Sequence, residues 1–487
     1  MPRPEHVGER LGRDEQPVVN VQRDAETVEA PAGLRLSIAS ALLPDGWAEE
    51  VALDIDSAGD ILAVRSEAPA AGRTRVEGVV VPGMPNVHSH AFQRAMAGLA
   101  ESASAGPDFW SWRDVMYRFA NRVTDDDILA IAGQLFVEML KSGYTAVGEF
   151  QYLHHRPDGA RFENPARMTL AVHEAARQTG IGVTLLPALY MRRGFDAESA
   201  TEAQRRFVNS LESWLDIVQA AGRVCADDAN ARVGLAFHSL RAVPPDVLRQ
   251  AMSAADSIDQ AAPRHIHVAE QAEEVRACQV ATGQRPIAWL LEKLPVDERW
   301  CVIHATHMDD DEVAALAGSG AVTGLCPTTE ANLGDGVFAL EAYLESGGAI
   351  AVGSDSNVSV SPVAELRCLE YGQRLTHQRR RIHGRAGDGH VGASLWRGAV
   401  SGGAHALGRP IGRIAPQCRA DLVVLDAAHP SLTGRSKDTL LDSWIFASQE
   451  SPVRDVMVGG RWVVRDGRHA QQEAIAEAYR RAMARIC

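Results

Sequence analysis

Eight apolar, strand-like runs constrain the fold of this chain more than any other feature. Each run is followed by a longer stretch with helical periodicity, which is the pattern of βα units built around a parallel sheet. Eight such units predict an α/β fold, a closed (β/α)8 TIM-type barrel, over residues 85–407. The runs end near His90, Phe150, Tyr190, His238, Ala269, His304, Cys326 and Asp355.

Both flanks of the expected barrel carry β-strand patterns. Short apolar stretches alternate with turn residues from about Leu34 to Val81, and strand-like text returns beyond about Gly408. A polar-apolar helix is expected near the C-terminus. We therefore expect residues 33–84 and 408–487 to form one composite domain. Residues 1–32 are polar and charged, without the apolar core of a signal peptide, and are expected to be a disordered tail.

Composition excludes several classes of protein. The seven cysteines are scattered without any C-x-x-C pair, which argues against a disulfide framework and fits a reducing cytoplasm. A formal charge of -14 disfavours nucleic acid as a partner, because phosphate binding requires a positive field. No run approaches the roughly 18 apolar residues of a membrane span. The expected partner is a small-molecule substrate.

The first chemical signal is a pair of histidines, His88 and His90, at the end of the first barrel strand. Alternation along a strand places both imidazoles on one face, pointing into the barrel mouth. An isolated H-x-H is usually two unrelated histidines. At the carboxyl end of a barrel strand, where the catalytic groups of such barrels lie, the pair indicates a metal site.

Three further strand ends supply the groups that a catalytic metal site needs. They carry His267, His304 and Asp355. A catalytic zinc site requires three or four nitrogen and oxygen ligands and a position for water. His88, His90, His267 and Asp355 satisfy that count. His304 then remains free to act on the bound water.

These positions resemble those of the metal-dependent amidohydrolase superfamily. The resemblance implies that the two flanks complete a β-sandwich domain beside the barrel. The run ending in Ala236-Phe237-His238 offers no lysine that could be carbamylated to bridge two metals. We therefore expect one divalent metal ion, Zn²⁺, although Fe, Mn and Co can share such a site.

The motif His267-Val268-Ala269-Glu270 resembles the deaminase branch of the superfamily. In that branch the glutamate passes a proton to the departing nitrogen, which implies this role for Glu270. The expected catalytic residues are then Glu270, His304 and Asp355. The alternative is an ordinary glutamate in the first turn of a helix, favoured there by the helix dipole.

Segments along nearly the whole chain resemble the formimidoylglutamate deiminase family. The resemblance implies hydrolysis of N-formimino-L-glutamate to N-formyl-L-glutamate and ammonia in histidine degradation, by a homodimer. The segments are PGMPNVHSHAFQRAMAGLAE, FWSWRDVMYR, GYTAVGEFQYLHH, FHSLRAV, CVIHATH, TEANLGDG and GSDSNVS.

A substrate with two carboxylates requires local cations, because a protein at -14 cannot attract it through its overall field. Arginine suits a carboxylate through its bidentate fork, and Arg113 and Arg241 are the expected carboxylate ligands. Gln93, Tyr152 and His238 are the expected hydrogen-bonding partners. Each has a plainer alternative: Arg113 could stack on Trp112 at the surface, Tyr152 could pack in the core, and Gln93 could cap a loop.

The sequence is also compatible with two other functions. A deaminase of a guanine- or adenosine-type ring would need a wider pocket with stacking aromatic side chains. A non-catalytic scaffold with the same barrel would typically lack metal ligands.

Overall fold

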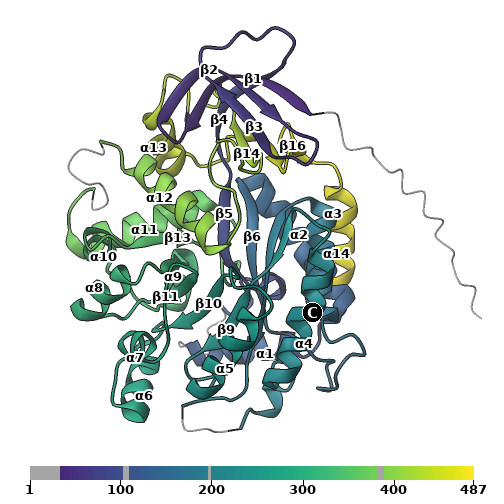
Figure 1. Cartoon of the computed structure of the whole chain (residues 1–487), viewed down its shortest axis with the longest axis vertical. Helices are drawn as coiled ribbons and strands as arrows, with labels where there is room; N and C mark the ends of the chain where they lie inside the picture. The colour runs from purple at the N-terminus through teal and green to yellow at the C-terminus, as the bar shows by residue number, and fades with distance from the viewer. Residues whose placement is uncertain (1–32, 102–108, 196–198, 382–388) are drawn as a thin grey trace, which may run out of the picture.

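The computed structural model describes residues 33–101, 109–195, 199–381 and 389–487, and has two parts (Figure 1). A parallel barrel fills the centre, and a second sheet, built from the first and last described strands, lies at one end. The tail expected over residues 1–32 lies outside the described residues.

The barrel confirms the fold expected from the sequence. Neighbouring strands pair in parallel, and backbone hydrogen bonds close the ring between its first and last strands: Asp355 N–H donates to the His88 carbonyl (2.9 Å), and His90 N–H donates to the Asp355 carbonyl (3.0 Å). The strands follow the order β5 (Met84–Ser89), β6 (Tyr144–Gln151), β7 (Gly182–Leu189), β9 (Leu235–Ser239), β10 (Arg264–Val268), β11 (Trp300–His304), β12 (Val322–Leu325) and β13 (Ala349–Val352).

One run expected as a single strand is divided in two. β8 (Ala231–Val233) pairs with β7, and β9 begins only after Gly234. Gly234 N–H donates to the Leu185 carbonyl, whereas the next amide, Leu235 N–H, donates to Pro263 on the other side (both 2.8 Å). A Cβ atom at position 234 would lie 2.9 Å from the Pro263 ring. The glycine therefore lets the chain approach β10 while it remains beside β7.

The helices surround the barrel (Figure 1). A capping box begins α8, in which Asp309 accepts a hydrogen bond from Glu312 N–H. The helices are α1 (Phe109–Ala120), α2 (Asp125–Ser142), α3 (Arg167–Thr179), α4 (Leu211–Cys225), α5 (Pro245–Asp256), α6 (Ala272–Thr282), α7 (Pro286–Lys293), α8 (Asp310–Gly318), α9 (Pro327–Leu333), α10 (Leu340–Glu345), α11 (Pro362–His377) and α12 (Val391–Ala406), with short 3-10 turns η1 (Ala91–Met96) and η3 (Glu202–Gln204).

The second sheet joins the two ends of the described chain. β4 pairs in parallel with β1 and antiparallel with β14, so a late strand continues the early sheet. Its apolar side chains form a core cluster of their own. The order is β17 (Arg468–His469), β16 (Arg461–Arg465), β15 (Val453–Val458), β14 (Leu422–Leu425), β4 (Thr74–Pro82), β1 (Leu34–Leu43), β2 (Gly46–Ile55) and β3 (Ile61–Arg65).

The last two helices pack against helices of the barrel. α13 (Asp438–Ala447) packs on α12 through Trp444 and Trp396, whose ring centroids are 4.6 Å apart. α14 (Gln472–Ile486) runs beside α2 (Figure 1), where Arg485 forms an ion pair with Asp127. None of the helices in the described ranges is long and apolar enough to cross a membrane.

Candidate metal centre and active site

Four buried side chains converge where the first, fifth and last barrel strands end. Nε2 of His88 lies 3.2 Å from Nε2 of His90 and 2.9 Å from Nε2 of His267. The Oδ1 atom of Asp355 lies 3.5 Å from the first of these nitrogens and 3.3 Å from the second. The ligand atoms all lie within 4.8 Å of one another. The structure thus brings the four expected ligands together.

The protonation of the imidazoles suits metal binding. Nδ1–H of His90 donates to the Phe150 carbonyl (2.9 Å), and Nδ1–H of His267 donates to the His238 carbonyl (2.8 Å). Burial, followed by neighbouring imidazoles, holds the pKa of His88 and of His267 well below the usual value, so these rings are neutral. Their Nε2 atoms therefore present lone pairs to the centre.

The donor set fits a divalent cation. Lone pairs 3 Å apart repel unless a cation lies between them. Bonds of about 2.0–2.1 Å to a tetrahedral ion imply ligand atoms about 3.3 Å apart, close to the distances between these donors. Three imidazoles and one carboxylate are ligands of transition metals rather than of Ca²⁺ or Mg²⁺.

A polar network fixes the ends of β5 and β13. The Asn86 amide donates to the Ser354 hydroxyl (2.7 Å), and the Asn357 amide donates to the carbonyls of His90 (3.0 Å) and Asp355 (2.9 Å). The backbones of Asp355 and Asn357 have φ of 44° and 59°. Such strained conformations persist only where surrounding contacts hold them, and they cluster at functional sites.

His304 lies beside the four donors and is surrounded by carboxylates. Its Nε2 atom is 3.9 Å from Oδ2 of Asp355 and 3.8 Å from Oε1 of Glu270, and its Nδ1 atom is 3.1 Å from Oε1 of Glu330. Burial lowers the pKa of His304, but these carboxylates together raise it to about 10. Burial raises the pKa of Glu270 to about 7. A cationic imidazole and a carboxyl group that titrates near neutrality therefore face the same space.

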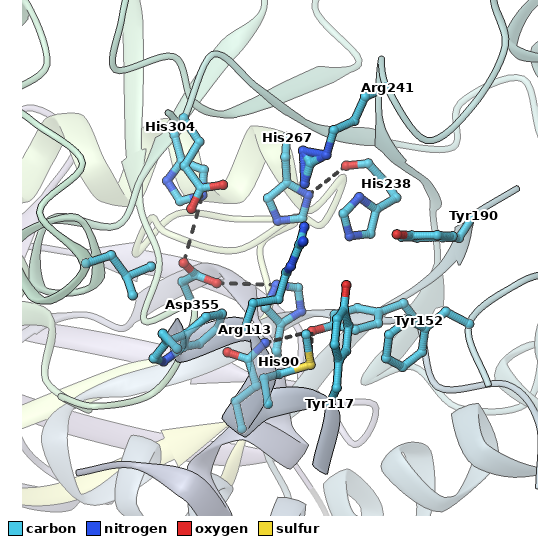
Figure 2. A pocket seen from close by; sticks show the side chains of 16 residues that line it. His90, Arg113, Tyr117, Tyr152, Tyr190, His238, Arg241, His267, His304 and Asp355 are labelled. Atoms are coloured by element: carbon cyan, nitrogen blue, oxygen red, sulfur yellow. Dashed lines mark hydrogen bonds and ion pairs between the residues drawn. The ribbon is translucent and has the colours of Figure 1, made fainter. Parts of the chain in front are cut away.

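One pocket contains most of the residues expected from the sequence (Figure 2). His88 lies beneath it, fully buried. Gln93 and Tyr152, expected to bind substrate, bond to each other, since the Gln93 amide donates to the Tyr152 hydroxyl (2.7 Å). The expected residues that line the pocket are His90, Gln93, Arg113, Tyr152, His238, Arg241, His267, Glu270, His304 and Asp355.

The two expected arginines reach the pocket from different elements. Arg113 extends from α1, and its guanidinium carbon lies 5.6 Å from the centre of the Tyr117 ring. Arg241 follows β9 and approaches from the opposite side of the view in Figure 2. Burial lowers the pKa of Arg241, and the nearby carboxylates, Glu274 first, raise it above the usual value. Both arginines also line a second cavity outside the first.

Several residues that line the pocket were not predicted from the sequence. Their aromatic and apolar side chains come from α1, from the residue after β7, from the segment after η3 and from the end of α9. Four of them lie in segments that carry the family resemblance: FWSWRDVMYR contains Trp112, Met116 and Tyr117, and TEANLGDG contains Leu333. The unassigned lining residues are Trp112, Met116, Tyr117, Tyr190, Phe207 and Leu333.

Comparison with known proteins identifies the family of this chain. A family model described as the amidohydrolase family matches residues 79–463. A protein of Pseudomonas aeruginosa named formimidoylglutamate deiminase is 51% identical over 441 residues, covering 90% of this chain and 96% of the relative. A 5-methylthioadenosine/S-adenosylhomocysteine deaminase of Natronomonas pharaonis is 28% identical and covers 84% of this chain and 86% of the relative.

Solved structures share the fold. The crystal structure of an amidohydrolase from Brucella melitensis superposes with a TM-score of 0.87 and 42% identity, covering 94% of this chain and 100% of the other. An adenosine deaminase from Xanthomonas campestris with bound zinc gives a TM-score of 0.78 at 21% identity, with 94% and 99% coverage, and shows the fold alone. The family model and the close relatives match both the barrel and the sheet beside it, so this chain belongs to the amidohydrolase family.

Proposed function

We propose that this chain catalyses the hydrolytic deimination of N-formimino-L-glutamate to N-formyl-L-glutamate and ammonia, a step of histidine degradation. One observation carries the proposal: a single pocket joins a metal-type donor set to the two arginines Arg113 and Arg241. The substrate has the matching form, an amidine at one end and two carboxylates at the other. The relative at 51% identity supports this substrate.

The metal ion would be held by His88, His90, His267 and Asp355, and we propose Zn²⁺. When bound, such an ion supplies a water molecule whose pKa is lowered towards about 7. The donor set of three imidazoles and a carboxylate supports zinc.

The chain's own groups divide the proton transfers between them. Asp355 has one carboxylate oxygen among the metal donors and the other 3.9 Å from Nε2 of His304, so it accepts the proton of the attacking water. The cationic His304 stabilises negative charge that develops on the oxygen added to the reacting carbon. Glu270, in the same pocket, is a carboxylate when the protonated amidine binds. It takes up the hydroxyl proton of the adduct and passes it to the terminal nitrogen, so the C=O bond forms as the C–N bond breaks and ammonia leaves.

Charge sets the orientation of the substrate. The protonated amidine complements the carboxylates of Glu270 and Asp355, whereas Arg113 and Arg241 complement the carboxylate end. Gln93, Tyr152 and His238 line the pocket between these groups and provide hydrogen bonds. The reverse orientation would place carboxylate against carboxylate, so it is disfavoured.

The direct test is ammonia release by purified, zinc-loaded protein. N-formimino-L-glutamate should react, with N-formyl-L-glutamate as the organic product. Guanine, adenosine and 5′-methylthioadenosine serve as comparison substrates, because the aromatic wall of the pocket could also stack on a ring. Ammonia released only from a ring substrate would overturn the proposal. Release from none of them would favour a non-catalytic scaffold.

Three further proposals concern organisation. We propose that residues 33–84 and 408–487 fold as one domain beside the barrel of residues 85–407, supported by the pairing of β4 with β14. We propose a homodimer, on the family resemblance alone, which light scattering tests. We propose a reducing cytoplasmic location, supported by seven cysteines that form no disulfide, which fractionation tests.

A further inference from the structure

Gln204 is a buried glutamine that makes four hydrogen bonds beside the pocket. Its Oε1 atom accepts from the backbone N–H of Thr201 (2.9 Å) and from the Thr201 hydroxyl (3.1 Å). Its Nε2 atom donates to the hydroxyl oxygen of Tyr190 (2.6 Å) and to that of Tyr117 (3.1 Å). The side chain is 1% exposed. The amide oxygen thus accepts two hydrogen bonds, and the amide nitrogen donates both of its hydrogens.

The orientation of this amide is fixed by its surroundings. Thr201 offers an N–H group at the start of η3, in a capping box that only an acceptor at position 204 can complete. The oxygen must therefore face Thr201, and the NH₂ group must face the two tyrosines. Each phenol oxygen receives one of its two hydrogens.

Each phenol oxygen therefore accepts a hydrogen bond from Gln204, and its own O–H hydrogen is left to donate to another group. Within the described part of the chain, neither hydroxyl donates a hydrogen bond. Both rings line the pocket, and Figure 2 shows them entering it from different elements. Burial raises the pKa of the Tyr190 hydroxyl, so this hydroxyl keeps its proton.

The arginines lie close to these hydroxyls. Arg113 stands over the Tyr117 ring at 5.6 Å, and the charges of Arg241 and Arg113 both act on the Tyr190 hydroxyl. Two guanidinium groups and two O–H donors therefore surround one part of the pocket. The ligand that such a set recognises is a carboxylate with several acceptor lone pairs.

We propose that Tyr117 and Tyr190 donate hydrogen bonds to a substrate carboxylate, and that Gln204 is the positioning residue that makes both hydroxyls donors. The inference deepens the proposed function by naming binding groups for its dicarboxylate end. It assigns an anion subsite of four donor groups: Arg113, Arg241, Tyr117 and Tyr190.

The first test removes the hydroxyls singly, as Y117F and Y190F. A hydrogen bond to a charged group is lost in each, so KM for N-formimino-L-glutamate should rise about tenfold with kcat nearly unchanged. The dissociation constant of glutarate, a dicarboxylate without an amidine, should rise by about the same factor. The matched control is Y343F on α10, whose hydroxyl lies 3.4 Å from the Ala321 carbonyl in the core, and it should leave both constants unchanged.

The second test reverses the direction of the hydrogen bonds. Q204E keeps an acceptor for Thr201, so the capping box remains, but its carboxylate accepts from the phenols instead of donating to them. Glutarate binding should weaken more than in either tyrosine variant. In the Q204E background, adding Y117F and Y190F should cost little more, because the hydroxyls are already engaged. Equal melting temperatures of Q204E and wild type would confirm intact folding.

Activity and binding separate the two proposals. If wild type releases no ammonia from N-formimino-L-glutamate, the proposed function fails, yet glutarate binding still reports on the subsite. If wild type is active but Y117F, Y190F and Q204E bind glutarate as wild type does, the subsite is refuted. Additive losses in the Q204E background would refute the positioning role of Gln204.

Discussion

Glu330 accepts a hydrogen bond from His304: Oε1 of the carboxylate lies 3.1 Å from Nδ1 of the imidazole. The same oxygen also accepts from the Cys326 backbone N–H (2.9 Å). Glu330 is on α9 and His304 ends β11, so a neighbouring βα unit holds the imidazole with its Nε2 atom towards Asp355 and Glu270.

Replacing Glu330 by glutamine should therefore reduce kcat without removing the metal. The E330Q amide can still accept from one donor, but the His304 ring loses a charged partner, and losses of about 10–100-fold are typical of such supporting residues. Steady-state kinetics together with metal analysis would check this. An unchanged kcat would mean that Glu330 has only a packing role.

Removing the metal should abolish activity and leave the fold in place. The barrel core is apolar, whereas the four donors would repel one another without a cation, so the apoprotein should melt at a lower temperature. Dialysis against a chelator, circular dichroism and re-addition of Zn²⁺ test this. The variant H88N should hold far less than the roughly one ion per chain expected of a single-metal site. Full activity after complete chelation would contradict the metal assignment.

Glu270 should be essential for turnover and dispensable for metal binding. The variant E270Q retains the shape of the side chain but cannot transfer a proton, and general acid-base groups typically contribute about 10²–10⁴-fold to rate. The loss should appear in kcat. E273Q is the matched control, because Glu273 lies in the first turn of α6 and pairs with Arg276 at 2.6 Å. Equal losses in both variants would argue against a specific role.

Arg241 should act through substrate affinity. Lysine keeps the positive charge in R241K but cannot form the two parallel hydrogen bonds of a guanidinium fork, so KM should rise about tenfold or more. The kcat value should change far less, since the carboxylates are remote from the reacting carbon. R276K on the exposed side of α6 should behave as wild type. A loss confined to kcat would place Arg241 near the reaction instead.

Stability should depend on pH through Glu365 on α11. Its carboxyl group accepts from the Thr328 hydroxyl (2.6 Å) and N–H (2.9 Å), and burial raises its pKa from 4.5 to about 8. Between these values the folded chain binds one more proton than the unfolded chain at this site. The free energy of unfolding should fall as pH rises through that window, by at most about 1.4 kcal/mol per pH unit.

The variant E365Q remains neutral and should flatten this part of the stability profile. Chemical denaturation at pH 5, 6, 7 and 8 would measure the slope. E345Q, at the exposed end of α10, should leave the slope as it is in wild type. Parallel profiles for E365Q and wild type would show that Glu365 does not set the slope.

The sequence alone was sufficient to predict the barrel and the gathering of His88, His90, His267 and Asp355 at one end of it. Strand and helix periodicities are local properties, and the donors lie at or just beyond the carboxyl ends of predicted strands, which a barrel necessarily gathers at one face. His267 and Asp355 are 88 residues apart along the chain and still could be grouped by that rule. The division of one strand at Gly234 was missed, because it depends on contact with Pro263 from another unit.

Only the tertiary structure shows the residues of the site that do not lie at the end of a predicted strand. Gln204 meets Tyr117 and Tyr190 only because α1, β7 and η3 fold against one another, and nothing in its local sequence indicates a phenol partner. The same holds for Glu330 beside His304. Hydrogen-bond direction and the burial that shifts a pKa depend on neighbours distant in sequence. The periodicity of the sequence therefore determines the helices and strands and the end of the barrel at which the strand-end residues gather. The packing of the helices and strands determines which other side chains share the pocket.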